Sequence, residues 1–163
     1  MGEQTVARRF ELAIAVEAYL EAFYTALAEK FLHVMPVADF WRRMAEQERT
    51  HALQLEVIRD SLSEAELQAP LAFADDDTYD LILAHPVAER VAKVQDLEDA
   101  FALSAALETP ETNALFSFLI RNFARNTQVV ELLLEALRQH VEQLADFARY
   151  FGVGENRRKI KTR

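Results

Sequence analysis

The stretch WRRMAEQERTHALQLEVIRDSL, Trp41 to Leu62, decides the fold, because charged residues occupy positions that an amphipathic helix reserves for apolar side chains. Steps of alternately three and four residues keep side chains on one face of a helix, along a line that we call a seam. The seam of this stretch reads Trp41, Met44, Glu48, His51, Leu55, Ile58 and Leu62. A buried carboxylate and a buried imidazole are costly unless something pairs with them, so a cation shared by Glu48 and His51 would account for both.

The composition predicts one all-α domain. The chain has 163 residues, 51% of them hydrophobic, with only three Gly and four Pro. Such a length suits a single domain, which we place at residues 1–156. Hydrophobic periodicity predicts four long helices joined as a bundle, with Pro36 in the short connection between the first two. The first helix is expected from about Thr5 to His33, and the second follows the connection Val34 to Ala38 and ends at about Ser63. The other two are expected at about Asp96 to Asn122 and Thr127 to Phe151.

The connection from Glu64 to Val91 is too long to be structureless in a compact domain. We therefore expect it to hold a short helix at about Thr78 to Ala84 and to cross the length of the bundle. A crossover of this kind lets the second and third long helices run parallel, whereas the short turn before the second helix makes the first two antiparallel neighbours.

Polar residues interrupt the other three seams as well. Glu17 lies among apolar positions of the first helix, which predicts that it is buried. The alternative interpretation is a half-exposed acid at a loosely packed position. The third helix carries Glu108 and Glu111; Thr109-Pro110-Glu111 also resembles a helix start, but we favour a continuous helix with a kink at Pro110. His140 is the polar member of the fourth seam, and a lone buried His is more often a satisfied core residue than a ligand.

The convergence of these residues predicts a metal site. Acids and histidines lie near the middle of four helices, so a bundle would bring them to similar depths. The chain has no cysteine, which leaves only oxygen and imidazole ligands. Such ligands suit iron, manganese or zinc, and several carboxylates that bridge two ions would be typical of iron or manganese.

These motifs resemble the rubrerythrin branch of the ferritin-like superfamily. The resemblance is carried by AIAVEAYLEAFYTAL (13–27), MAEQERTHALQLEVI (44–58) and LETPETNALF (107–116). It implies a ferritin-like four-helix bundle with a di-iron centre, and Tyr24 at the aromatic position of the family. The metal ligands that it implies are Glu17, Glu48, His51, Glu108, His140 and, as a second, mobile carboxylate, Glu111.

Two departures from the family pattern concern the second ion and the supply of electrons. Leu137 stands where the family has a glutamate that bridges the two metals. The four-cysteine rubredoxin-type domain of full-length rubrerythrins has no counterpart in a chain without cysteine. An oxidoreductase of this kind would need an external electron donor.

Three functions are consistent with the sequence. The first is a non-haem iron oxidoreductase that reacts with peroxide or oxygen. The second is a metal-binding or iron-handling protein without turnover, and the third is a structural bundle whose buried acids are protonated or paired. Metal ions are the expected partners of the first two.

Charge and hydropathy exclude other classes of partner. The basic segment RRKIKTR (157–163), which we expect to be a disordered tail, leaves 13 Lys and Arg against 27 acidic residues in the rest of the chain. So acidic a domain repels nucleic acid. The most apolar stretch is interrupted by Glu17 and Glu21, which argues against a membrane span. The lack of cysteine suits a reducing cytoplasm.

A homodimer is a further expectation. The chain has eleven Phe, more than the four seams absorb. Those off the seams could form an exposed apolar strip for a second copy, or they could pack beneath the crossover. They are Phe23, Phe40, Phe116 and Phe123.

Overall fold

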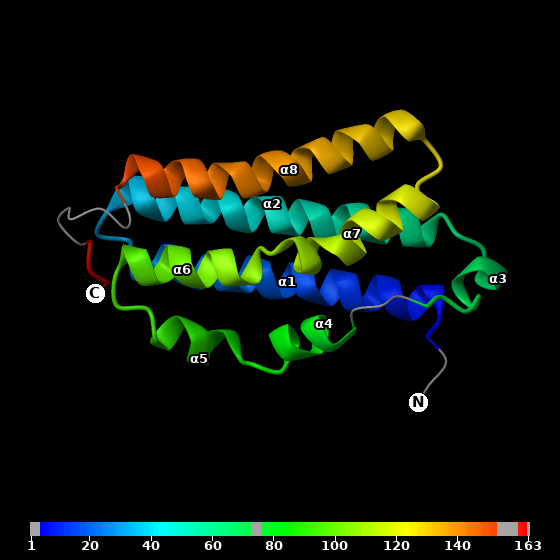
Figure 1. Cartoon of the computed structure of the whole chain (residues 1–163), viewed down its shortest axis with the longest axis horizontal. Helices are drawn as coiled ribbons and strands as arrows, with labels where there is room; N and C mark the ends of the chain where they lie inside the picture. The colour runs from blue at the N-terminus through cyan, green and yellow to red at the C-terminus, as the bar shows by residue number, and fades with distance from the viewer. Residues whose placement is uncertain (1–3, 73–75, 153–159, 163) are drawn as a thin grey trace.

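Four rows of helix run side by side in the structure, a computed structural model that describes residues 4–72, 76–152 and 160–162 (Figure 1). Two long helices, α1 (Val6–Lys30) and α2 (Met35–Asp60), form an antiparallel pair. The third row consists of α6 (Leu97–Leu107) and α7 (Pro110–Phe123), placed end to end, and the fourth is α8 (Thr127–Tyr150). The predicted all-α bundle is therefore confirmed.

The predicted crossover between the second and third rows is present, with more helix than expected. It contains α3 (Glu64–Leu67), α4 (Asp76–Leu83) and α5 (Val87–Ala92), whereas the sequence indicated only the helix that became α4. The last two pack on α1 while carrying the chain back along the bundle (Figure 1). As a result the α6–α7 row runs parallel to α2, as predicted.

The row of α6 and α7 corrects the prediction of one continuous helix. The first helix ends at Leu107, and Thr109 starts the second by accepting a hydrogen bond from the amide of Thr112. Pro110 occupies the first turn, where its missing N–H costs nothing. The helix-start signal was therefore the correct interpretation, and Glu108 lies in the break between the two helices.

Pro36 likewise lies inside the first turn of α2 instead of preceding the helix. The sequence placed Pro36 in a connecting segment, but the helix starts at Met35 and includes this proline in its first turn. A proline ring fits there because the first amides of a helix have no intrahelical acceptor. At the other end of the chain, α8 stops before Gly152, whose φ of 65° favours glycine.

The buried core follows the predicted seams, which turns the polar seam residues inward. The seam positions of α2 from Trp41 to Ile58 are all buried. So is every position of the seam of the first helix, which the same spacing predicts as Phe10, Ala13, Glu17, Leu20, Tyr24, Leu27 and the C-cap Phe31. Trp41 is completely buried, stacked on Tyr24 with ring centroids 5.7 Å apart and also packed against Phe40 and Phe101. The core therefore surrounds the polar residues of these two helices with apolar and aromatic side chains.

The off-seam phenylalanines are not exposed. Phe23, Phe40 and Phe116 are buried within the single chain, and Phe123 packs edge-on against Phe10. The apolar strip that they were expected to form on the surface is therefore absent from this set of residues. The homodimer stays a prediction without that basis.

The described residues near the C-terminus are hydrogen-bonded to the segment around the start of α6. Of the basic segment 157–163, residues 157–159 and 163 lie outside the described part of the chain. Ile160 accepts a hydrogen bond from the amide of Leu97, and the amide of Thr162 donates to Gln95. Among the described residues, no helix combines the length and apolar character required to cross a membrane.

Candidate metal centre

Five buried ionisable side chains meet in the middle of the bundle. Each is at most 7% exposed, although they come from four different helices or helix ends. Glu17 comes from α1, Glu48 and His51 from α2, Glu108 from the end of α6 and His140 from α8. The structure thus brings together five of the six predicted ligands.

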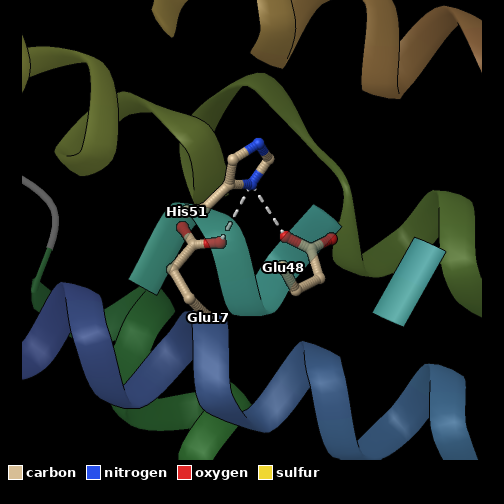
Figure 2. A group of neighbouring side chains, drawn as sticks. All are labelled: Glu17, Glu48 and His51. Carbon is tan, nitrogen blue, oxygen red and sulfur yellow. Dashed lines mark hydrogen bonds and ion pairs between the residues drawn. The ribbon is translucent and has the colours of Figure 1, made fainter. Parts of the chain in front are cut away.

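The first group consists of Glu17, Glu48 and His51 (Figure 2). His51 Nδ1 lies 3.0 Å from Glu48 Oε2 and 3.4 Å from Glu17 Oε2. Figure 2 shows both carboxylates turned toward this nitrogen from adjacent helices. The i, i+3 spacing puts Glu48 and His51 on one face of α2, and the antiparallel packing of α1 supplies the third side chain.

The second group consists of Glu48, Glu108 and His140. His140 Nε2 lies 2.8 Å from Glu48 Oε1 and 3.0 Å from Glu108 Oε1. The hydroxyl of Tyr24 donates a hydrogen bond of 2.8 Å to the same oxygen of Glu108. The position of Glu108 is therefore held from two sides.

Glu48 belongs to both groups, and each of its oxygens faces a different one. Oε2 lies beside His51, and Oε1 lies beside His140. Within each group the three potential ligand atoms lie within 4.8 Å of one another. A carboxylate placed in this way could contact two neighbouring cations, one in each group.

The electrostatics of the carboxylates differ. Burial, together with the nearby charge of Glu48, raises the pKa of Glu17 to about 8 and also raises the pKa of Glu108. Burial alone would raise the pKa of Glu48 too, but hydrogen bonds from His140 and His51 outweigh it and hold that pKa below its usual range. Glu48 is therefore the carboxylate that stays ionised.

The two imidazoles are protonated more readily than usual because of the neighbouring carboxylates. Burial opposes protonation, yet the hydrogen bonds to Glu17 and Glu48 raise the pKa of His51 to about 9. Those to Glu108 and Glu48 raise the pKa of His140 to about 10. In the metal-free protein these protons occupy the positions where a cation would neutralise the acids.

One buried atom shows that protons do not satisfy the cluster completely. Among the described residues Glu48 Oε1 accepts no hydrogen bond of regular geometry, although His140 Nε2 lies 2.8 Å away, because the regular hydrogen bond of that nitrogen goes to Glu108. A buried carboxylate oxygen without a well-formed hydrogen bond is costly. With three carboxylates and two imidazoles around it, the donor set fits iron, manganese or zinc.

The sixth predicted ligand, Glu111, does not join the cluster. It is exposed in the first turn of α7 and belongs to neither group of potential ligands. A spacing of three residues keeps two side chains on one face only within a continuous helix, and the chain breaks between Glu108 and Glu111. Leu137, at the position of the expected bridging glutamate, is buried.

Gln47 is a site residue that the sequence analysis missed. Its Oε1 accepts a hydrogen bond of 2.7 Å from His140 Nδ1, and its Nε2 donates to Gln143 at 3.0 Å. This contact leaves Nε2 of His140 facing the carboxylates. Because Gln47 lies off the seam of α2 and its contact is with α8, periodicity within one helix carries no signal for it.

Comparison with known proteins places the fold. No family model matches the chain, and no curated protein sequence matches it. The crystal structure of a candidate ferritin-like diiron-carboxylate protein from Thermotoga maritima superposes with a TM-score of 0.63 at 19% sequence identity, covering 91% of this chain and 95% of that one. The chain therefore has the all-α ferritin-like fold that its helical seams predicted.

Proposed function

We propose that this protein is a rubrerythrin-like non-haem iron oxidoreductase that binds iron in the buried cluster and reacts with peroxide or oxygen. The observation that carries the proposal is Glu48, whose two oxygens face two separate sets of ligand atoms. Two adjacent cation positions would neutralise acids that the apolar core otherwise isolates from water. Manganese and zinc suit the same donors, so the metal itself has to be identified by experiment.

Each residue has a defined part in this proposal. Glu17 and His51 would hold one ion, Glu108 and His140 the other, and Glu48 would contact both. Tyr24 keeps Glu108 in place through its hydroxyl, and the low exposure of all five ligands excludes bulk water. Bound iron would supply the redox chemistry with peroxide or oxygen. An external electron donor would be required for repeated turnover.

A metal-binding protein without turnover is the second candidate. The observation that favours it is Leu137, an apolar residue where the family places a bridging carboxylate. A third candidate, a structural bundle, is favoured by the short contacts between imidazoles and carboxylates, which give the acids partners in the absence of metal. A cytoplasmic location and a homodimer stay predictions for all three.

Elemental analysis of the purified protein separates the candidates. A di-iron oxidoreductase should contain about two metal ions per chain, a single-ion binding protein about one and a structural bundle none. The ferrous protein should then develop a visible absorption band when peroxide is added, and it should consume peroxide when a chemical reductant is present. Bound iron without peroxide consumption would exclude the oxidoreductase and favour the second candidate, a metal-binding protein without turnover. A protein that takes up no metal would overturn the proposal.

Metal binding should weaken as the pH falls. With pKa values of about 9 and 10, His51 and His140 carry protons at neutral pH, whereas a metal ligand must be a neutral imidazole. Binding therefore releases protons, and each proton displaced should raise the apparent Kd about tenfold per pH unit lowered. Competition titrations with a chelator at several pH values measure this slope, and a Kd that does not depend on pH would contradict it.

Replacing Gln47 should weaken metal binding without removing a ligand. In Gln47→Leu, His140 Nδ1 loses its acceptor, so the ring is no longer held with Nε2 toward the cluster. Loss of such a supporting hydrogen bond typically costs about 10- to 100-fold in metal affinity. Gln143→Leu is the matched control, since it leaves the contact between Gln47 and His140 intact. Equal affinity in both variants would show that Gln47 does not position the imidazole.

A further inference from the structure

A cavity of about 830 Å³ lies between α7 and α8, beside the buried cluster. From α7 it is lined by residues that include Asn113 and Ser117, and from α8 by residues that include Leu134 and Val141. Glu108 also lines it, and no other residue of the cluster does. The cavity therefore leads from solvent to one particular ligand.

The charge of the cavity favours a cation. Its lining includes Glu131, Glu135 and Glu142 near solvent and Glu108 at the inner end, against two arginines. One of these, Arg138, is already paired with Glu135 and Glu142. Among the described residues no salt bridge involves Glu131, so its charge is free to act on an approaching ion. Acidic walls of low dielectric raise the local concentration of cations.

Glu108 is placed to pass an ion inward. Its Oε1 is held inside by Tyr24 and His140, whereas its Oε2 accepts a long hydrogen bond of 3.4 Å from Asn113, a residue of the cavity wall. Its side chain is 2% exposed, so an ion reaches it only if the carboxylate turns toward the cavity. The residue is the C-cap of α6: its amide still donates a hydrogen bond to the carbonyl of Ser104, but its backbone torsions are no longer helical.

The α8 side of the cavity is the more weakly packed wall. In α8 the buried residues are Leu137, His140 and Leu144, so the first ten residues of the helix contribute none. A segment with few buried contacts opens locally at a low free-energy cost. The wall that contains Glu131 and Leu134 can therefore widen while the cluster itself stays assembled.

We propose that the cavity between α7 and α8 is the route by which a divalent cation reaches the buried cluster, with Glu108 as the first ligand it meets. This inference rests on the proposed function, because it presumes that the cluster takes up metal. It adds a path, and it assigns the exposed acid Glu131 a part in the rate of uptake. A route affects the rates of binding and release together, whereas a ligand affects the affinity.

The test is the kinetics of Co²⁺ uptake by the metal-free protein, followed by stopped-flow absorption of the bound ion. Ser117→Trp fills the cavity from the α7 side and should slow both association and dissociation by about tenfold or more, with Kd changed less than about twofold. Leu134→Trp fills it from α8 and should do the same. Ala136→Trp is the control: it adds at least as much volume as either variant, at an exposed position of α8 that is not part of the lining.

Charge removal tests the route without changing its shape. Glu131→Gln should slow association about two- to threefold at low ionic strength, and the difference should disappear at high salt because the attraction is screened. Glu46→Gln removes an exposed acid outside this cavity and should change nothing. As Glu131 is exposed, its variant will fold even if a tryptophan variant does not.

The outcomes separate the two proposals. A wild-type protein that binds no Co²⁺ would overturn the proposed function, and the route with it. Wild-type binding with unchanged rates in Glu131→Gln and in the tryptophan variants that fold would overturn the route alone. Slower uptake at unchanged Kd in these variants, but not in the controls, would support it.

Discussion

Glu48→Ala should abolish metal binding at both positions of the cluster. The side chain supplies one oxygen to Glu17 and His51 and the other to Glu108 and His140, so its loss removes a ligand from each group. We expect the metal content after loading to fall from about two ions per chain to nearly none. The measurement is elemental analysis after loading with excess Fe²⁺ and desalting.

The same variant should lose the stabilisation that metal confers. A ligand present at about 100 times its Kd adds about 2.7 kcal/mol to the free energy of unfolding, and a variant that binds nothing gains none of this. The thermal transition of the wild type should therefore rise when Fe²⁺ is added, and that of Glu48→Ala should not. Glu46→Ala, an exposed position on the same helix, serves as the control. Wild-type iron content in Glu48→Ala would eliminate this residue as a ligand.

Trp41→Ala should produce the largest loss of folding stability. The indole is fully buried and contacts three other aromatic rings, those of Tyr24, Phe40 and Phe101. Truncating such a side chain to alanine removes its burial and leaves a cavity, at a cost of about 3 to 5 kcal/mol. Because domains are typically stable by only about 5 to 15 kcal/mol, this is a large share of the total.

Chemical denaturation of the metal-free protein measures this effect, since it separates packing from metal binding. The midpoint should shift strongly for Trp41→Ala and hardly at all for Leu132→Ala, which changes a leucine that is 69% exposed. Trp41→Phe should fall between them, because it keeps most of the apolar volume. A loss below about 1 kcal/mol for Trp41→Ala would show that the aromatic core around Trp41 tolerates a cavity.

The seam of each helix could be predicted because helix periodicity is local. All predicted seam positions of α1 are buried in the structure, including Glu17 and Tyr24. For the same reason the inward orientation of Glu48, His51 and His140 followed from their spacing alone. In the third row, Glu111 does not face the cluster as predicted, because a spacing of three residues keeps two side chains on one face only within a continuous helix. The sequence signal for a kink at Pro110 is the same as that for a helix start, so the break could not be predicted.

The sequence by itself determined that four helical segments would bury acids and histidines at similar depths, since 3.6 residues per turn sets which side chains share a face. Only the tertiary structure decided that the two oxygens of Glu48 face different histidines, that Gln47 supports His140 from a neighbouring helix, and that the cavity beside α8 ends at Glu108. These features depend on the relative rotation and spacing of helices, which follow from how side chains from distant segments pack together, and no pattern within one helix encodes them.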